Sequence, residues 1–465
     1  MANIFGLMNI AQSSLYTQQK AIDVTGNNIA NVNTPGYTRQ RLNLVQDRPN
    51  ISGNHLLGTG VTSEKGIQRF YDQFLNGQLN TQNEGLGRWE AQQDALQKIE
   101  LMFDEVSGFG LSNAMSEYWN AWQDVANHPA GVVERTSLVS AGQYMAETFN
   151  HVSESLSSLR EEIDLHVDSI VDDINTMAQQ IADLNHKISL QEIDGHNANT
   201  LRDERDQLVF ELSKMIEVQS FEDGDGNISV SVGSGRPLVE GTSTWTLLTA
   251  DNGGVQNVMW QDSSGATVDI TNQIDSGELK GWIESRDVML ADYANQLDNL
   301  ANTVITEVNA LHSTGTTLDG VTTTGVDFFS GSNAGTISVN ANIVANTDLI
   351  AAAGAAGSIP GDNSNAISIA NLQSDSTLMP GNSTFDGYYN ALVGAIGSDV
   401  QAAGYNYDHQ TTMVHSLENY RQEISGVSLD EEMVNLIQHQ HAYNAAAKMI
   451  NAADEMLSAL MGILN

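Results

Sequence analysis

The stretch Asn27-Asn-Ile-Ala-Asn-Val-Asn-Thr-Pro-Gly-Tyr-Thr-Arg-Gln40 ends a long helical pattern near the start of the chain. Upstream of its proline, residues spaced alternately four and three apart form the seam of a helix that packs against another helix. Thr34 precedes Pro35 and is pushed out of helical torsions, and Pro35-Gly36 favours a turn. We therefore expect the helix to end near Asn33 and an extended segment to follow. The seam residues are Ile4, Met8, Ala11, Leu15, Gln18, Ile22, Thr25, Ile29 and Val32.

The same spacing recurs at the other end of the chain. Ser428, with Glu431 three residues later, forms a capping box that starts this second helix. Each pattern continues for about four heptads or more, which is long for an ordinary amphipathic helix on a globular core. The sequence therefore predicts that the two chain ends pair with each other. The second seam consists of Leu429, Met433, Leu436, Gln440, Tyr443, Ala447, Ile450, Asp454, Leu457, Met461 and Leu464.

Both ends also resemble a known group of proteins. The run Asn27–Gln40 resembles the N-terminal signature of bacterial flagellar rod, hook and hook-associated proteins, and Ser425–Glu432 resembles their C-terminal counterpart. Within this superfamily, residues 111 to 135 are similar to a segment typical of the hook–filament junction family, which the hook and rod proteins lack. That segment contains Leu111–Met115, Tyr118–Asp124, Asn127–Pro129 and Arg135.

Composition limits the class of protein. The chain has 465 residues, no cysteine and a net charge of −39, so disulfides and thiolate chemistry are excluded, and nucleic acid and anionic membrane surfaces are poor partners. There is no apolar run of the length of a membrane span and no signal peptide of the Sec type. Residues 1–71 carry six basic and three acidic residues, a net charge of +3, so the N-terminal arm is basic while the remainder is acidic.

Helical periodicity dominates the middle of the chain. It begins near Ile67, continues through Phe103 and stops at Ser107–Gly110. It resumes over Leu111–Asn127 and forms its longest seam from Met145 to Ile188, with a stutter around Ile170. His166 lies on that seam and is expected to be a core polar residue that sets register. Further helices are expected over residues 201–216, 277–312 and 388–423.

Period-two alternation replaces the helical pattern from Val218 and predicts a small β domain. The Gly-rich run Asp223–Asn227 matches the first calcium-loop positions, but Ile228 stands where an EF-hand needs glycine, so we interpret the run as a hairpin turn. We predict four parts: a terminal coiled-coil domain with its connector (1–64 and 421–465), a helical bundle (65–217, 276–312 and 386–420), a β-rich domain (218–275), and a Gly/Ser/Thr/Asn-rich segment (313–385) that is structured and packs on the bundle or the β domain.

No catalytic motif of the common nucleophile, phosphate-loop or zinc types occurs. His439 and His441 are two residues apart on a predicted helix and cannot share a metal. The acidic pairs Glu161-Glu162 and Asp172-Asp173 are the residue types that a peptidoglycan hydrolase uses, but they lie on long helix faces and are interpreted as solvated charge. We expect no enzymatic activity, no cofactor and no metal.

The predicted fold is mainly α with a β-rich outer domain, in the layered architecture that the resemblance to flagellin-like proteins implies. The resemblance also implies an extracellular structural subunit at the hook–filament junction of the flagellum, exported uncleaved through the type III pathway. Implied partners are like subunits in a ring, the hook protein, a second junction protein, filament subunits and an export chaperone. The expected assembly-interface residues are Leu15, Ile22, Asn27, Asn28, Ile29, Asn31, Pro35, Gly36, Tyr37, Arg39, Leu429, Met433, Leu436, Tyr443, Ile450 and Leu457.

Two alternatives remain open from the sequence. One is another axial protein, such as a hook protein or a flagellin, against which the segment around Trp119 and Trp122 argues. The other is a peptidoglycan-degrading enzyme carried on an axial scaffold, which only the acidic pairs support.

Overall fold

A computed structural model describes residues 2–46, 50–52, 55–57, 60–103, 110–193, 197–224, 226–319, 325–354 and 359–464. These residues form a mainly α-helical fold with small antiparallel sheets, as predicted. The chain divides into two compact units, each of which combines early with late segments. We call Met1–Gly87, Ile170–Glu278 and His409–Asn465 the terminal unit, and Arg88–Ser169 and Leu279–Asp408 the bundle unit. The four-part division stays a prediction.

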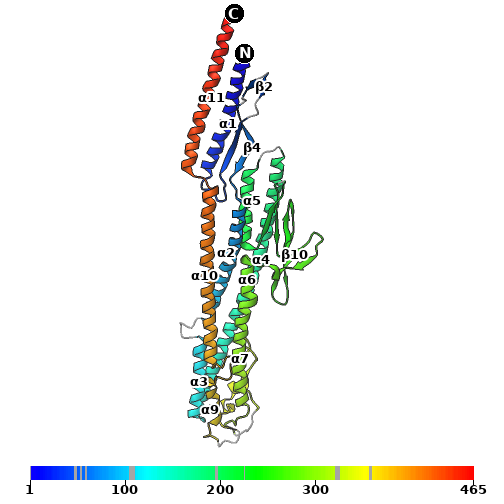
Figure 1. Cartoon of the computed structure of the whole chain (residues 1–465). Coiled ribbons are helices and arrows are strands. Elements are labelled where there is room, and N and C mark those ends of the chain that lie inside the picture. Colours follow the sequence, from blue (N-terminus) through cyan, green and yellow to red (C-terminus); the bar gives the residue numbers. More distant parts are fainter. Residues whose placement is uncertain are drawn as a thin grey trace. The chain divides into compact units, whose positions relative to one another are not determined.

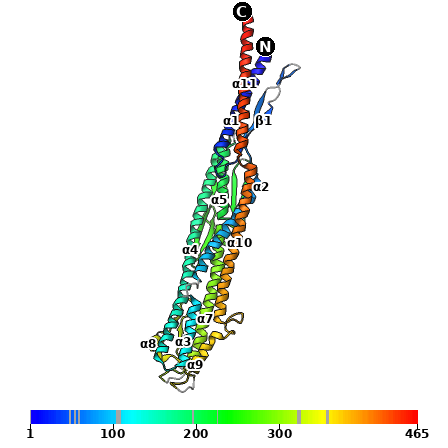
Figure 2. The same cartoon turned by 90° about the vertical axis from the view of Figure 1, so that its left-hand side faces the viewer.

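The chain ends pair within the terminal unit, which confirms the pairing predicted from the two seams. Helix α1 (Ala2–Ala30) packs along α11 (Leu429–Leu464); the two helices lie side by side in Figure 1 and cross in the view of Figure 2. Helix α11 begins directly after Ser428, where the capping box predicts its start. Helix α1 ends three residues before the predicted Asn33, and a turn follows.

A pair of antiparallel strands follows that turn. Strand β1 (Gln40–Gln46) pairs with β4 (Val61–Arg69), and the short strands β2 (Asn50–Ser52) and β3 (His55–Leu57) pair with each other between them. Helix α1 packs on β1 and β4 as well as on α11. Ser13 Oγ in α1 donates a hydrogen bond of 2.6 Å to the carbonyl oxygen of Val61.

The predicted start of the next helix at Ile67 is wrong. Ile67 lies in β4 opposite Leu42, and α2 (Gln73–Met102) begins six residues later. Ile67 is followed by Phe70 and Phe74, and this spacing of three and four fits a helical pattern. Pairing with β1 decides between the two conformations, and the sequence of a short apolar segment does not reveal that pairing.

The predicted β domain follows α5 (Asn199–Met215). Burial alternates along β6, as the period-two pattern requires. The Asp223 backbone N–H donates to the Asn227 carbonyl oxygen across the predicted hairpin turn, whose Asp225 lies outside the described residues. One sheet has the order β5 (Gln219–Glu222), β6 (Ile228–Val232), β7 (Arg236–Glu240), β8 (Ser243–Thr244); the other has the order β11 (Thr267–Asp269), β10 (Gln256–Gln261), β9 (Thr246–Asp251), and η1 (Thr271–Gln273) follows it.

The bundle unit is mostly helical. Helices α2, α4 (Val132–Glu192) and α10 (Phe385–Ser425) contribute residues to both units. The predicted helix over 277–312 contains a π-helical stretch that the sequence pattern does not indicate. Before residue 313 the unit also contains α3 (Leu111–Asn127), α6 (Glu278–Glu284), the π-helix η2 (Ser285–Leu290) and α7 (Ala291–His312).

The Gly/Ser/Thr/Asn-rich segment is structured over its described residues, as predicted. Residues 320–324 and 355–358 lie outside them. Its elements are β12 (Phe329–Ser330), β13 (Ser338–Val339), α8 (Ala341–Ala345), η3 (Thr347–Leu349), α9 (Ser364–Asn371) and η4 (Leu372–Ser374).

Aromatic side chains of α3 fill the core of the bundle unit. Trp119 and Trp122 are buried, and Trp119 stacks on Phe385 with ring centroids 5.6 Å apart. Trp122 lies against Phe328 at 5.4 Å. Each such aromatic pair stabilises by about 1 kcal/mol beyond the area it buries. The segment that resembles the junction family therefore packs residues of 313–385 against the helices.

Arg135 fixes the same segment by polar contacts. Its guanidinium is buried and donates hydrogen bonds to the carbonyl oxygens of Pro129, Thr347 and Ile350 at 2.7, 2.9 and 2.9 Å. Burial lowers the pKa of Arg135 from its ordinary value. Three backbone acceptors thus compensate the buried cation and tie η3 to the start of α4.

The buried face of α4 follows the predicted seam except at one histidine. His166 is half-buried rather than a core residue, and its ring stacks on Trp282 with centroids 4.7 Å apart. The adjacent Val167 is buried instead. The stutter near Ile170 explains this difference, because two successive steps of four rotate the buried face by one residue.

Among the described residues, no helix combines the length and apolarity needed to cross a membrane.

Candidate assembly site at the paired chain ends

The turn after α1 is shaped by its own side chains. Asn31 Nδ2 donates to Asn27 Oδ1 at 2.7 Å, and Thr34 Oγ1 donates to Asn31 Oδ1 at 3.2 Å. Gly36 has a φ of 76°, and a Cβ at this position would lie 2.8 Å from Gln207 Oε1. Only glycine meets both conditions without strain. The Pro35-Gly36 turn is therefore a site of close approach to α5.

Asn28 is the centre of a polar network at the end of α1. Its Nδ2 donates to the carbonyl oxygen of Gln40 at 2.8 Å and to Glu432 Oε2 at 3.0 Å. Its Oδ1 accepts from Tyr37 Oη and from the Gln40 backbone N–H, both at 2.9 Å. The side chain is 1% exposed, so these four hydrogen bonds satisfy a buried amide completely. We call Asn28, Tyr37, Arg39, Gln40 and Glu432 the Asn28 network.

Glu432 connects this network to the other end of the chain. Its carboxylate is buried and accepts hydrogen bonds from Arg39 as well as from Asn28. Arg39 Nη2 lies 2.8 Å from Glu432 Oε1, and Arg39 Nη1 lies 2.8 Å from Glu431 Oε2. The Arg39 backbone N–H donates to the Ser425 carbonyl oxygen at 2.8 Å. The two signature segments of the sequence thus meet in one charge-assisted contact.

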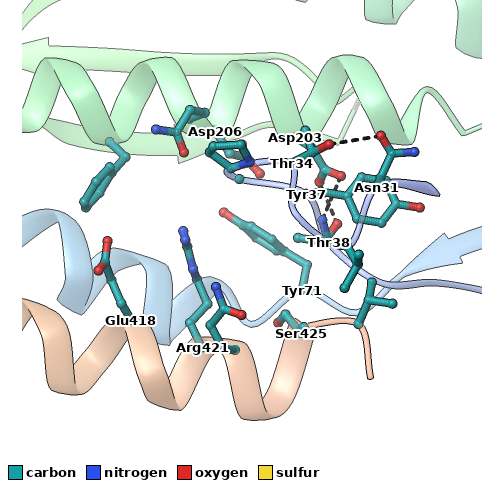
Figure 3. A pocket seen from close by; sticks show the side chains of 18 of the residues that line it. Asn31, Thr34, Tyr37, Thr38, Tyr71, Asp203, Asp206, Glu418, Arg421 and Ser425 are labelled. Atoms are coloured by element: carbon teal, nitrogen blue, oxygen red, sulfur yellow. Dashed lines mark hydrogen bonds between the residues drawn. The ribbon is translucent and has the colours of Figure 1, made fainter. Parts of the chain in front are cut away.

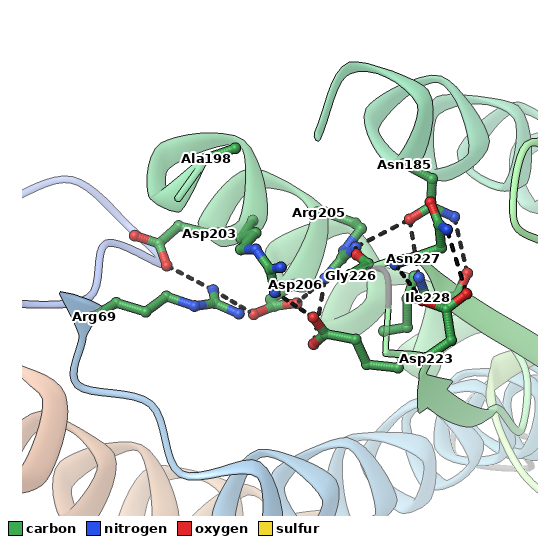
Figure 4. A network of polar contacts seen from close by, with 12 residues as sticks. Arg69, Asn185, Ala198, Asp203, Arg205, Asp206, Asp223, Gly226, Asn227 and Ile228 are labelled. Carbon is green, nitrogen blue, oxygen red and sulfur yellow. Dashed lines mark hydrogen bonds and ion pairs between the residues drawn. The ribbon is translucent and has the colours of Figure 1, made fainter. Parts of the chain in front are cut away.

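A second network attaches the turn to α5. Asp203 accepts from the backbone N–H and the Oγ1 of Thr38, at 3.1 and 2.6 Å. Arg69 Nη1 lies 2.9 Å from Asp203 and 2.7 Å from Asp206 (Figure 4). Burial raises the pKa of both aspartates, against the opposing effects of Thr38 and Arg69 at Asp203 and of Arg69 and Arg205 at Asp206.

Arg205 extends the second network into the β domain. Its side chain is fully buried, and Nη1 donates to Asn185 Oδ1 at 3.0 Å and to the Gly226 carbonyl oxygen at 2.6 Å (Figure 4). Removal of one charged partner from such a network leaves a buried charge uncompensated. The network therefore fixes the turn, α5 and the β5–β6 hairpin to one another.

A cavity of about 450 Å³ lies beside the turn. Residues 31–38, Tyr71, α5 and the end of α10 line it, and Tyr71 and Arg421 point into it (Figure 3). Burial raises the pKa of Tyr71 and of Tyr37, so both phenols stay neutral near neutral pH. Among the described residues, no cluster of three or more His, Asp or Glu side chains has the arrangement of a metal site.

The contact between α1 and α11 uses small residues. Ala11, Ala21 and Val24 of α1 are buried, and so are Ala446 and Ala453 of α11. His439 Nδ1 lies 2.8 Å from Gln18 Oε1, and burial lowers the pKa of His439, so a neutral ring joins the two helices. Small side chains let the two backbones approach closely, so the pair packs along a narrow stripe.

The predicted register of the α11 seam is off by about one residue. Leu429 and Met433 are 48% exposed, and Tyr443 is also exposed, although the spacing places all three on the seam. The stripe that faces α1 contains residues seven apart: Glu432, Ala446 and Ala453, which are buried, and His439, which is half-buried. The hydrogen bonds of Glu432 to Asn28 and Arg39 fix which side of α11 faces α1. A seam predicted from large apolar residues alone does not include Glu432 or the alanines and therefore misses this orientation.

The remaining predicted interface residues divide between two environments. Asn28 is buried and Tyr37 and Arg39 are half-buried, all three in the Asn28 network. Asn27, near the end of α1, and Pro35, in the turn, are exposed. The residues that are half-buried are Leu15, Ile22, Ile29, Asn31, Gly36, Leu436, Ile450 and Leu457.

Sequence reasoning missed three residues of the site. Glu432 was expected only as part of a signature, and Asp203 and Arg69 were not expected at the site. Glu432 lies next to the predicted capping box, and Arg39 lies in the opposite signature. Once the two ends are expected to pair, an acid in one signature and an arginine in the other indicate an ion pair between them. Nothing in the local sequence distinguishes Asp203 from its acidic neighbours.

Comparisons with known proteins assign the chain to a family. The model of the flagellar hook-associated protein FlgK helical domain matches residues 96–329. Models of the flagella basal body rod protein and of the flagellar basal body rod FlgEFG protein C-terminal region match residues 8–38 and 419–463. The two shorter matches contain Asn28, Tyr37 and Glu432 of the Asn28 network.

Full-length relatives agree with these matches. The chain is 32% identical to flagellar hook-associated protein 1 of Bacillus subtilis, with 98% of each chain covered. It is 26% identical to the protein of the same name from Salmonella typhimurium over 98% of this chain and 99% of that one. The fold is similar to the flagellar hook junction protein FlgK from Burkholderia pseudomallei, with a TM-score of 0.66 at 17% identity, covering 75% of this chain and 100% of that chain. The chain belongs to the family of flagellar hook-associated protein 1.

Proposed function

We propose that this chain assembles with further copies of itself through its paired ends. Membership of the family makes it a structural component of the bacterial flagellum at the junction of hook and filament. One observation supports the proposal most strongly. Asn28, Arg39 and Glu432 join the two signature segments, so α1 and α11 form one surface. The predicted interface residues on that surface are proposed to contact neighbouring subunits or to shape the turn.

The proposed partners follow from the family. Like subunits form a ring, the hook protein lies on one side of it, and a second junction protein and filament subunits lie on the other. An export chaperone holds the chain before it leaves the cell uncleaved through the flagellar type III pathway. Immunogold microscopy of isolated flagella tests the location directly. We expect label at the boundary of hook and filament, and label along the whole filament or none at all would contradict the proposal.

We also propose that the chain has no catalytic activity. Glu161, Asp172 and Asp173 are exposed on the outer face of α4, and Glu162 is paired with Lys98 Nζ at 2.8 Å. None of these carboxylates lines one of the described cavities of either unit. A turbidity assay on purified peptidoglycan tests this proposal. Lysis that is lost when one acidic pair is changed to amides would contradict it.

A further inference from the structure

The outer side of α11 carries large apolar side chains that its partner α1 does not cover. Met433, Val434 and Ile437 in its first turns are 48, 54 and 49% exposed. The inner side makes its contact through a stripe of residues seven apart, with alanines at 446 and 453. A helix whose small residues face one partner while its large apolar residues face water has a second apolar face that lacks a partner in the single chain.

Helix α1 exposes a complementary surface. Tyr16 is 63% exposed, and Lys20 Nζ lies 4.5 Å from the centroid of its ring. Among the described residues, Lys20 makes no ion pair with a carboxylate. Arg41 on β1 likewise stacks on Phe70, with its Cζ 4.6 Å from the ring centroid. Two cations on aromatic rings thus mark the N-terminal segment as a basic, amphipathic surface.

The net charges of the two chain ends indicate which surface could cover the outer face of α11. Residues 421–465 carry two basic and six acidic residues, a net charge of −4, and Asp430 is exposed beside Val434. Residues 1–71 have a net charge of +3 in a chain whose total is −39. Contact between acidic surfaces is repelled, whereas the N-terminal segment attracts α11. Inside one chain, α1 and α11 contact each other through other faces than these, with Glu432, Ala446 and Ala453 buried on the α11 side.

We propose that the outer face of α11, formed by Met433, Val434 and Ile437, docks onto the exposed Tyr16–Lys20 surface of α1 in a second copy of this chain. The contact is heterologous, because the two copies use different faces, and repetition of it closes a ring or continues as a helix. Each copy then has its α11 between two α1 helices, one from its own chain and one from its neighbour. This inference rests on the proposed self-assembly and names the faces that carry it.

Cross-linking in isolated flagella tests the pairing of faces. The chain has no cysteine, so Tyr16→Cys and Ile437→Cys each introduce a unique thiol. Cells express both variants together or one alone, and their flagella are treated with a short bismaleimide. We expect a covalent dimer when both variants are present and none when either is alone, because a heterologous contact never brings two identical positions together. Dimers in a single-variant strain, or none in the mixed strain, would overturn the inference.

A matched position controls for random collision. Val133 in α4 is 78% exposed, and Val133→Cys replaces Ile437→Cys in the control strain. No dimer with Tyr16→Cys is expected there, and a yield equal to that of Ile437→Cys would overturn the inference. If the chain is absent from the flagella, the proposed function itself fails. If it is present without the predicted dimer, only the named pairing fails.

A charge on the outer face gives an independent measurement. Ile437→Asp places a carboxylate in the proposed contact and should weaken association by about tenfold or more, which releases filaments into the medium. Val133→Asp should leave filament retention unchanged. Both positions are largely exposed in the single chain, so the melting temperature of each monomer should match the wild type. Normal retention of filaments by Ile437→Asp would contradict the inference.

Discussion

At the scale of single residues, two buried groups of opposite charge type give the two units opposite responses to pH. Glu84 in α2 belongs to the terminal unit, and its Oε1 accepts a hydrogen bond of 3.1 Å from the Val218 backbone N–H. Burial raises its pKa to about 7. The folded chain therefore holds this proton at pH values where the unfolded chain has released it.

We predict that the stability contributed by Glu84 is fully present below its ordinary pKa and is lost as the pH rises through about 7. The difference between the ordinary pKa of Glu84 and its raised pKa corresponds to about 3 kcal/mol, because one pKa unit is about 1.4 kcal/mol. Glu84→Gln keeps the acceptor for Val218 and should flatten this dependence. Hydrogen exchange of the terminal unit, measured from about pH 5 to about pH 8, checks the result. Equal slopes for the variant and the wild type would contradict it.

His312 gives the reverse response in the bundle unit. Its Nδ1 lies 2.7 Å from the Val326 carbonyl oxygen, and its Nε2 accepts from the Ala351 backbone N–H at 3.1 Å. Burial lowers its pKa to about 4, and the charge of Arg135 acts in the same direction. The ring is therefore neutral in the folded chain.

We predict that the stability contributed by His312 is present above its ordinary pKa of 6.5 and is lost as the pH falls through about 4. His312→Gln retains one donor and one acceptor, so it should weaken the acid dependence even if it lowers stability at every pH. Hydrogen exchange in α7 reports on this unit separately from the terminal unit. The prediction fails if exchange in α7 of the wild type slows on acidification after correction for the intrinsic rate.

At the scale of elements, the asparagines of the N-terminal signature have unequal roles. Asn28 makes four hydrogen bonds while buried, whereas Asn31 is half-buried and its hydrogen bonds lie at the surface. We predict that Asn28→Ala destabilises the terminal unit by about 2 to 4 kcal/mol, because it leaves Gln40 and Glu432 with unsatisfied groups. Asn31→Ala should change it by about 0.5 kcal/mol or less. Thermal unfolding of both variants measures the difference, and equal losses would refute this division.

The same elements show how far the sequence predicts the site. The unbroken spacing of four and three predicts both helices and their pairing, because apolar periodicity reflects burial of a helix face. It does not predict the rotation of α11, because Ala446 and Ala453 make the contact while the larger Met433 and Tyr443 are exposed. Periodicity also does not predict the role of Glu432, because its partners Asn28 and Arg39 lie near the opposite end of the sequence.

At the scale of the whole molecule, long-range contacts decide what local patterns leave open. Ile67 joins a strand because β1 pairs with it, and His166 leaves the core because the seam rotates near Ile170. Asp203 belongs to the site only because Thr38 and Arg69 reach it. The fold class, most helices and the presence of strands after Val218 follow from periodicity, whereas the polar networks follow from contacts between distant segments.

The opposite charges of the two ends and their narrow contact lead to a prediction for the free chain. Residues 1–71 have a net charge of +3 and residues 421–465 a net charge of −4, which favours pairing of unlike ends by a few tenths of a kcal/mol for each exposed ion pair. Most of α11 is exposed, so little apolar burial holds it before assembly. We predict that limited proteolysis of the monomer removes both ends quickly and leaves a resistant core of roughly residues 65–420.

Because the Asn28 network joins the two ends, we predict that proteolysis removes them together. Glu432→Gln removes the charge that Arg39 pairs with in the buried contact, so cleavage in α1 should accelerate along with cleavage in α11. Glu431 also pairs with Arg39, but its side chain is 62% exposed, and Glu431→Gln should have little effect on either rate. Mass spectrometry of the fragments over time follows both ends in one sample. Faster loss of α11 with an unchanged rate in α1 would show that the ends fold independently, because a shared network cannot release one partner without the other.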